Sequence, residues 1–237
     1  MTNQRISHLA GIFFETFGKT EHPACYDNDM KCTIDLHVHS KYSGDNDSEP
    51  EESIIQAIRL GLSGIAFTEH YSYEASEPIE GLREKYEDIK IFRGVEFSSA
   101  EGHCLIFGVN TDKLSIKYAP FRDIVRIVDL HGGVVIPSHP YRKGNGLGDS
   151  IFCSDGICAL EGYNGCNMHA YNAKAIEVAR KLNLPYTGGS DAHLPHEVGF
   201  CFTEFDEEVT YDDFVDILRR GNYRGVDRRK ISRLISL

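Results

Sequence analysis

The sequence predicts an α/β protein whose core is a barrel of parallel strands, each followed by a helix. Short runs rich in Ile, Val and Phe, apolar almost throughout, alternate along the chain with stretches of helical period. This pattern is typical of a parallel sheet whose outer face is covered by helices. Because the alternation is repeated many times, closure into a (β/α) barrel of eight or fewer units is the natural arrangement. The length of 237 residues fits one such domain.

The predicted elements begin near residue 31. Residues 1–30 show no sustained period and contain Gly18, Pro23 and Asn28, so we interpret them as an N-terminal extension. Residues 31–237 are interpreted as one barrel domain, since no internal repeat or low-complexity linker interrupts them. Strands are predicted at residues 33–38, 64–68, 91–97, 104–109, 134–137, 157–163 and 185–188. Helices are predicted at residues 50–60, 121–130, 170–182 and 211–220.

Two of the helices carry clear end signals. The segment 50–60 places Ile54, Ala57 and Ile58 on one face and acids in its first turn, where the helix dipole favours negative charge. The segment 121–130 repeats this pattern and is followed by Gly132-Gly133, which is typical of a helix C-terminus.

The composition argues against a secreted or membrane protein. No apolar run approaches the roughly 18 to 20 residues that a spanning helix needs, and Glu15 interrupts the first apolar run, so a leader peptide is not indicated. We therefore expect a cytoplasmic protein without a membrane partner. An odd number of scattered cysteines, with no Cys-x-x-Cys pair, predicts reduced, mostly buried thiols. They are Cys25, Cys32, Cys104, Cys153, Cys158, Cys166 and Cys201.

The formal net charge of −11 disfavours long nucleic acid and anionic membranes as partners, because both repel an acidic surface. One stretch near the C-terminus is basic, and we interpret it as a solvated helix end and tail. A patch that recruits a polyanionic substrate is the alternative. This C-terminal basic stretch comprises Arg219, Arg220, Arg224, Arg228, Arg229, Lys230 and Arg233.

Metal-capable side chains recur at the ends of the predicted strands. The first strand ends in the run Asp35 to Ser40, in which His37 and His39 project to the same side because they are two residues apart. Further motifs stand at later strand ends: TEH at 68–70, GVE at 94–96 with His103 opening the next strand, SHP at 138–140 and SDAH at 190–193. In a parallel barrel these ends lie on one face, where such folds place their chemistry.

Any one of these histidines alone would be read as a half-buried residue held by a hydrogen bond. Six of the eleven histidines at strand ends, together with Glu96 and Asp191, are harder to explain in this way. Buried polar groups are costly unless they are paired or bound to metal, and clustered imidazoles and carboxylates suit Zn²⁺, Mn²⁺ or Fe²⁺. The sequence therefore predicts a metal centre in which Glu96 can bridge two ions.

These motifs, in this order, resemble those of the PHP (polymerase and histidinol phosphatase) family over about residues 31–225. The resemblance implies a distorted, TIM-like (β/α)₇ barrel with two or three divalent ions, Zn, Mn or Fe. By motif, His37, His39, Glu96 and Asp191 would hold one ion. Glu96 would share a second ion with His103 and His139, and the third would be bound by Asp45, His70 and His193.

The resemblance is qualified at two places. Asp45 lies in a loop where Asp is a common turn residue, and some family members have His there. The Asp form is similar to a branch that includes nucleotide and oligoribonucleotide phosphatases, but that branch inserts a helical segment where this chain has only residues 111–120. The substrate of that branch is therefore not carried over.

The expected function is hydrolysis of a phosphate monoester of a small metabolite or nucleotide. A hydroxide bridging two metals would attack phosphorus, since a bound metal lowers the pKa of water to roughly 7. Asp191 or His193 is expected to relay the proton to the leaving group. Arg142 and Lys143 follow the SHP motif and are predicted to contact the phosphate or its remainder, although solvated loop charges are the alternative. Tyr42 and Asn164 are lesser candidates for lining the pocket.

Other functions remain open. The main alternative is a 3′–5′ exonuclease or oligonucleotide phosphodiesterase, which the acidic composition disfavours. Amidohydrolase chemistry is a further alternative, but no lysine stands at a predicted strand end to be carbamylated. A domain that has lost its metals is the last alternative, and the complete ligand set argues against it. The oligomeric state is not predicted.

Overall fold

The structure is a computed structural model that describes residues 31–229. The predicted N-terminal extension, Cys25, Lys230 and Arg233 lie outside the described residues. None of the helices among the described residues is both long and apolar enough to cross a membrane.

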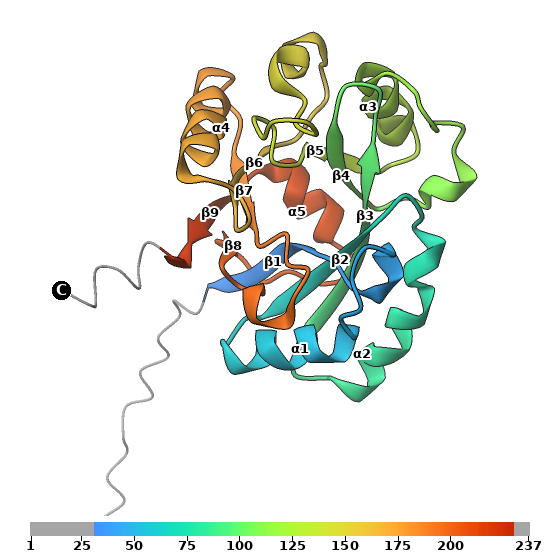
Figure 1. Cartoon of the computed structure of the whole chain (residues 1–237), viewed down its shortest axis with the longest axis vertical. Coiled ribbons are helices and arrows are strands. Elements are labelled where there is room, and N and C mark those ends of the chain that lie inside the picture. The colour runs from blue at the N-terminus through green and yellow to red at the C-terminus, as the bar shows by residue number, and fades with distance from the viewer. Residues whose placement is uncertain (1–30, 230–237) are drawn as a thin grey trace, which may run out of the picture. The chain divides into compact units, whose positions relative to one another are not determined.

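The core is a curled sheet of seven strands in the order β5-β4-β3-β2-β1-β8-β9, with a second, two-stranded sheet formed by β6 and β7 (Figure 1). Strands β1, β2 and β3 are parallel, as are β6 and β7, whereas β4 is antiparallel to both β3 and β5, and β8 to both β1 and β9. The strands are β1 Cys32–Val38, β2 Gly64–His70, β3 Lys90–Ser98, β4 His103–Phe107, β5 Val134–Pro137, β6 Leu160–Asn164, β7 Tyr186–Gly189, β8 Cys201–Phe205 and β9 Tyr223–Asp227.

The helices pack their apolar faces against the sheets. They are α1 Pro50–Arg59, α2 Leu82–Lys85, α3 Phe121–Leu130, α4 His169–Lys181 and α5 Phe214–Arg220. Helix α3 buries Phe121, Ile124, Val125 and Val128, which recur at the spacing of one helical face. Helices α1 and α2 lie on one side of the molecule, and α3 and α4 lie on the opposite side (Figure 1).

The small sheet contacts the seven-stranded sheet at β1 and at β5. Beyond β7, Ala192 forms a parallel bridge with Val38, and the Asp191 amide donates to the His37 carbonyl at 2.6 Å. On the other side, the Cys158 amide, just before β6, donates to Val135 of β5 at 3.4 Å. These contacts bring the ends of β1, β5 and β7 close together, which is what positions the site.

The predicted parallel barrel is only partly right. The α/β class is confirmed, but the sheet is a mixed, curled half-barrel and not a clear (β/α)₇ ring. The expected alternation holds only in part, because within residues 31–229 no α-helix separates β3 from β4, β5 from β6 or β7 from β8. Strand β4 is antiparallel because only residues 99–102 join it to β3, whereas a parallel crossover needs about a dozen residues. The antiparallel pair β8 and β9 was not predicted at all.

Candidate metal centre

Nine predicted ligands lie at one rim of the sheet, and we call them the ligand cluster. They are His37, His39, Asp45, His70, Glu96, His103, His139, Asp191 and His193. Most of them end parallel strands or directly follow them. His103 reaches the same rim because β4 runs the other way, so the first residue of β4 lies where the parallel strands end. The prediction of parallel strands throughout would have placed it at the opposite end.

Four donor atoms of the cluster converge on one point. His37 Nε2 and His39 Nε2 are 3.1 Å apart, and each lies 3.3–3.4 Å from Glu96 Oε2 and 3.4 Å from Asp191 Oδ1. A tetrahedral ion with bonds of 2.0–2.1 Å has ligand atoms about 3.3 Å from one another. All four side chains are buried. These residues therefore fit a divalent ion, in agreement with the predicted first ligand set.

The tautomers of the two histidines point to the same conclusion. His37 Nδ1 lies 2.8 Å from Glu161 Oε1, which can only accept, so Nδ1 carries the proton. His39 Nδ1 lies 2.8 Å from Ser43 Oγ, whose hydroxyl donates to Glu69 at 2.5 Å. In the neutral rings both Nε2 lone pairs then face each other, an arrangement that repels unless a cation lies between them.

Glu96 joins this group to a second one. Its Oε2 belongs to the four-atom group, whereas its Oε1 lies 2.7 Å from His139 Nε2 and 3.3 Å from His103 Nδ1. Ser138 Oγ also donates to Oε1 at 2.8 Å. One carboxylate thus presents a separate oxygen to each of two groups, which is the arrangement expected of a bridging ligand.

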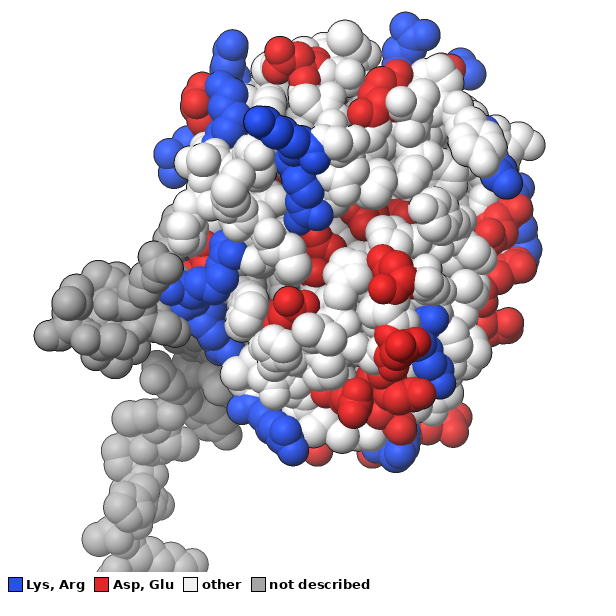
Figure 2. All heavy atoms as spheres, viewed as in Figure 1, with Lys and Arg blue, Asp and Glu red and all other residues white. Residues whose placement is uncertain are grey.

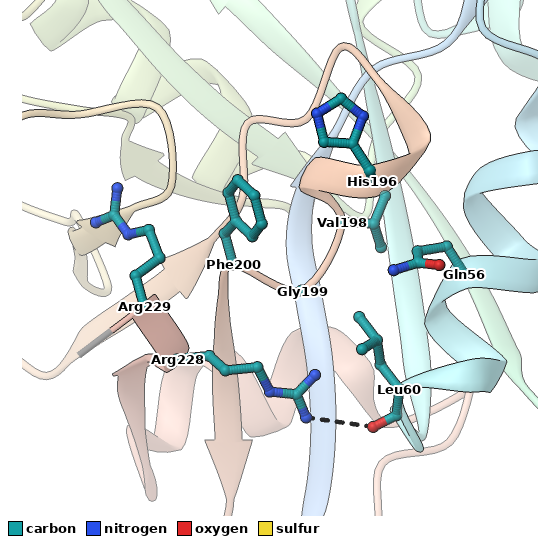
Figure 3. Close-up of a pocket in the computed structure, with 8 residues that line it drawn as sticks. All are labelled: Gln56, Leu60, His196, Val198, Gly199, Phe200, Arg228 and Arg229. Carbon is teal, nitrogen blue, oxygen red and sulfur yellow. Dashed lines mark hydrogen bonds between the residues drawn. The ribbon is translucent and has the colours of Figure 1, made fainter. Parts of the chain in front are cut away.

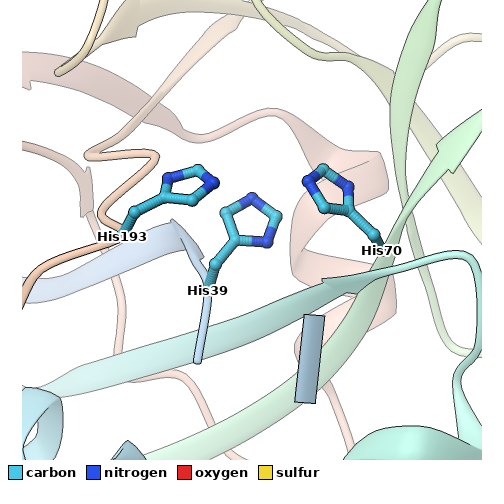
Figure 4. Close-up of side chains that lie close together, drawn as sticks. All are labelled: His39, His70 and His193. Atoms are coloured by element: carbon cyan, nitrogen blue, oxygen red, sulfur yellow. The ribbon is translucent and has the colours of Figure 1, made fainter. Parts of the chain in front are cut away.

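The third predicted group also comes together. Asp45 Oδ2 lies 3.1 Å from His70 Nε2 and 3.0 Å from His193 Nε2. The ring of His39 lies between those of His70 and His193 (Figure 4), at centroid distances of 4.4 and 4.6 Å. Within residues 31–229, the ligand atoms that lie close enough together to share an ion here belong to His39, His70 and His193, and Asp45 contacts the last two.

Burial and neighbouring charges shift the pKa values of several side chains in the ligand cluster. Burial and the nearby His39 lower the pKa of His70 to about 4, so its ring is neutral at physiological pH. Burial opposes ionisation of Glu96, but His37 and His139 outweigh it and hold the Glu96 pKa well below its usual range. The pKa of Asp191 is likewise lowered, since His37 and His39 outweigh its burial. Among residues 31–229, the buried His70 Nδ1 makes no hydrogen bond and lies 3.3 Å from Glu96 Oε2, whereas His70 Nε2 faces Asp45.

The backbone is strained where the cluster is built. His139 and Asp191 have φ values of 31° and 56°, in the left-handed region that costs a non-glycine residue of order 1–3 kcal/mol. Gly189, the last residue of β7 and two residues before Asp191, is required for close packing, because a Cβ there would lie 2.4 Å from His37 Cβ.

Several residues that support the cluster were not assigned a role from the sequence. Glu161 holds His37 and also accepts from the His139 amide at 2.6 Å, and it is fully buried. Glu69 accepts from Ser40 and Ser43. The signal that could have found Glu161 is an acid inside an otherwise apolar strand, which requires a partner.

Of the two predicted substrate-binding residues, Arg142 lies against the ligand cluster and Lys143 does not. Arg142 donates to Asp191 Oδ2 at 2.6 Å, to Asn164 Oδ1 at 2.7 Å and to Asn167 Oδ1 at 2.8 Å. It therefore lies against the cluster, together with the predicted Asn164. Lys143 is exposed, and no polar contact to the cluster is found for it within residues 31–229. Tyr42 is half-buried and packs against the core that contains Val38.

The C-terminal basic stretch does not form an open basic groove in its described part. Arg219, Arg220, Arg224 and Arg229 each pair with a carboxylate. Arg228 and Arg229 line a cavity of about 260 Å³, where Arg228 donates to the Leu60 carbonyl at 3.2 Å (Figure 3). On the face shown in Figure 2 the basic side chains form separate groups divided by uncharged surface.

The cysteines within residues 31–229 are all free thiols, as predicted. Cys32, Cys104 and Cys201 are buried, whereas Cys153 and Cys166 are exposed, so the prediction of mostly buried thiols holds for only part of the set.

Comparison with known sequences identifies two matched regions. Residues 35–146 match the PHP domain, and residues 169–223 match the PHP-associated region. A protein of Methanocaldococcus jannaschii is 29% identical over 51% of this chain and 75% of its own length. A Thermotoga maritima protein named probable histidinol-phosphatase is 34% identical over 27% of this chain, and a phosphoribosyl 1,2-cyclic phosphate 1,2-diphosphodiesterase of Eggerthella lenta is 35% identical over 36%. This chain matches only 30% and 34% of the lengths of these two named enzymes.

Solved structures share the fold. PsfC from Pseudomonas syringae aligns with 87% of this chain and 95% of its own, with a TM-score of 0.64 and 19% identity. A structure described as a metal-dependent phosphoesterase from Bifidobacterium adolescentis aligns with 79% of this chain and 96% of its own, with a TM-score of 0.59 and 18% identity. At these identities the likeness supports the fold alone.

Proposed function

Because this chain belongs to the PHP family and is a metal-dependent hydrolase of phosphoesterase type, we propose that it hydrolyses a phosphate monoester of a small metabolite or nucleotide. The observation that carries the proposal is the convergence of His37, His39, Glu96 and Asp191 on one point, at the separations that a tetrahedral ion requires. The metal could be Zn, Mn or Fe, all of which accept imidazole and carboxylate ligands.

Divalent ions bound by the cluster would supply an activated water at neutral pH and neutralise charge on the phosphoryl oxygens. The protein residues provide the remaining functions. Glu161 and Ser43 fix the ring orientations of His37 and His39. Arg142 offers its guanidinium beside the cluster, and no hydrogen bond of its Nη1 to residues 31–229 is found, so Nη1 remains available for a phosphate oxygen.

Proton transfer to the leaving group is assigned to His193 in preference to Asp191. Both oxygens of Asp191 are engaged, Oδ1 with the two histidines and Oδ2 with Arg142, and its lowered pKa leaves it without a proton. The His193 side chain is 35% exposed, and its Nε2 faces Asp45. Since Nε2 is also the atom that would bind a third ion, this role requires that only two ions are bound during turnover.

The charge distribution supports a small substrate over a nucleic acid strand. The formal net charge is −11, and the described arginines of the C-terminal basic stretch are largely paired with carboxylates. A strand-binding nuclease draws its affinity from many phosphate contacts with Lys and Arg. A monoester needs only the local charge of the metal centre and Arg142.

The test is hydrolysis of an aryl phosphate by metal-loaded protein and its variants. His37→Ala and Asp191→Ala should each abolish turnover while the fold survives, as judged by circular dichroism. His131→Ala, which changes an exposed histidine outside the cluster, is the matched control and should retain full activity. Persistent turnover in both cluster variants would show that the metal mechanism is wrong. Faster release of nucleotides from a single-stranded oligonucleotide than of phosphate from monoesters would favour the exonuclease alternative.

A further inference from the structure

A pocket of about 270 Å³ lies beside the ligand cluster, between the end of β3 and the segment that leads from β4 to α3. Its apolar lining comes from Phe97, Leu114 and Ile116, and two tyrosines, Tyr71 and Tyr118, line it as well. Pockets that bury a whole drug-sized ligand measure about 300–1,000 Å³. This pocket therefore suits one ring system rather than a complete nucleotide.

The pocket adjoins the proposed reaction site directly. Tyr71 follows His70 in the chain, and the two rings lie 5.5 Å apart between centroids. Ser98, another lining residue, pairs across the sheet with His103. A phosphate held by the cluster would thus leave its ester group within reach of the pocket.

The two tyrosines are unusually placed for residues of their size. Tyr71 is 69% exposed and Tyr118 is 80% exposed, so burial in the core does not account for either ring. Both have positive φ values, 66° and 59°, which are uncommon for bulky residues and cluster at functional sites. Exposed aromatic rings beside an apolar pocket offer stacking surfaces for a planar ligand.

The walls of the pocket are held together before any ligand binds. Asp112 Oδ2 accepts from the Glu74 amide at 2.8 Å and from Ser72 Oγ at 3.2 Å. At the other end of the segment, the Ala100 amide donates to the Ala119 carbonyl at 3.1 Å. A preorganised pocket loses less entropy on binding.

One polar atom in the lining lacks a partner. Thr111 is only 3% exposed, and its Oγ1 has no hydrogen-bond partner among residues 31–229. Leaving a buried hydroxyl unpaired costs about 1–3 kcal/mol. A ligand with a hydrogen-bonding edge would satisfy this hydroxyl, whereas a purely apolar ring would not.

We propose that this pocket binds the nucleobase of a nucleoside monophosphate whose phosphate is held by the ligand cluster. The proposal rests on the phosphatase function proposed above and narrows its substrate class. The apolar floor and the two tyrosines would contact the faces of the base, and Thr111 Oγ1 would hydrogen-bond to its edge.

Binding is measured separately from hydrolysis, so that the two proposals can fail independently. Adenosine monophosphate, cytidine monophosphate and ribose 5-phosphate, which lacks only the base, are titrated into the metal-loaded full chain by calorimetry. Phosphate release from the same three compounds is then followed. We expect the nucleotides to bind about ten-fold more tightly than ribose 5-phosphate, within the range for stacking of one base.

Two variants test the assigned residues. Tyr118→Ala should remove most of the preference for nucleotides, so that their affinity falls close to that of ribose 5-phosphate. Thr111→Val should also weaken nucleotide binding, while its melting temperature stays equal or rises because an unpaired hydroxyl is removed. Phe152→Ala, which removes an exposed aromatic ring outside the pocket, is the control and should change neither.

Failure of the base subsite and failure of the proposed hydrolysis give different results. Equal binding of nucleotides and ribose 5-phosphate, unaffected by Tyr118→Ala, would overturn the base subsite even if all three compounds are hydrolysed. Preferential nucleotide binding that is lost in the variants would support the subsite, even if no phosphate is released and the proposed hydrolysis itself fails.

Discussion

The Nδ1 atom of His37 lies 2.8 Å from Oε1 of Glu161, and both side chains are fully buried. The other oxygen of Glu161 accepts from the His139 amide at 2.6 Å and from Asn164 Nδ2 at 2.9 Å. Glu161 thus connects a ligand of the four-atom group to the backbone of a ligand of the Glu96–His103–His139 group. Such carboxylate–histidine pairs fix the tautomer and raise the basicity of the ligand.

We predict that Glu161→Gln weakens metal binding by about 10- to 100-fold, the usual cost of losing such a partner. The amide of Gln can still accept from His37 through its oxygen, but it carries no negative charge to raise ligand basicity. Metal affinity is measured by competition with a chromophoric chelator. The control is Glu177→Gln, an exposed residue paired with Lys174, and it should leave the affinity unchanged. Equal affinities for Glu161→Gln and the wild type would contradict the role assigned to Glu161.

Arg142 contacts the ligand cluster and its neighbour Lys143 does not, and this difference gives a second prediction. Arg142→Ala should lower kcat/KM for a phosphate monoester by about 100-fold, comparable to the loss of one donor that stabilises transition-state charge. Arg142→Lys should recover little, because one ammonium cannot contact Asp191, Asn164 and Asn167 as the planar guanidinium does.

Lys143→Ala is the neighbouring control and should stay within about two-fold of the wild type, since an exposed charge is screened by solvent. Metal content is measured in all three variants, because Arg142 also holds Asp191. A loss of activity that merely follows a loss of metal would assign Arg142 a positioning role and not phosphate binding.

The sequence predicted the ligand cluster better than the sheet that carries it. His37 and His39 were expected to share a face because strand geometry alone dictates this. Strand β8 was missed because its burial comes from pairing with β1. That pairing joins residues far apart in the chain, such as Cys32 and Phe205, and is not visible in local periodicity. The reversed direction of β4 was within reach, because the short link 99–102 rules out a crossover.

The supporting residues were less predictable than the ligands. Glu161 and Ser43 do not belong to a histidine motif, and their roles depend on the ring nitrogens of His37 and His39 that face them. The positive φ of Asp191 also depends on how β7 packs against His37, which no local pattern records.

The packing of β7 against β1 leads to a third prediction. Gly189→Ala should lower stability by about 1–3 kcal/mol, the range for overpacking, and should also reduce metal affinity. The added Cβ would lie 2.4 Å from His37 Cβ and 3.0 Å from Glu161 Oε1, so both side chains must move. Gly81→Ala is the control, because a Cβ there meets no atom within 4 Å and φ is not positive. Chemical denaturation and metal titration measure the two effects, and a fully stable Gly189→Ala protein with normal affinity would refute the packing argument.

Proton release on metal binding provides the last prediction. In the metal-free protein burial opposes protonation of His39, but Asp191 and Glu96 outweigh it and raise the His39 pKa to about 9. The His39 ring is therefore a positively charged imidazolium at about pH 7.5. Only the neutral ring can bind an ion, so metal binding must release at least one proton. Because the folded pKa is raised, the stability that His39 contributes to the metal-free protein is complete below about pH 6.5 and is lost as the pH rises through about 9.

Calorimetric titration with Zn²⁺ or Mn²⁺ in two buffers of different ionisation enthalpy measures the proton release that accompanies metal binding. We expect it to decrease above about pH 9, where His39 has already lost its proton. His70, whose pKa is about 4, should contribute nothing at neutral pH. Metal binding at about pH 7.5 with no proton release would mean that His39 is already neutral there, and the charge balance assigned to Glu96 and Asp191 would then be wrong.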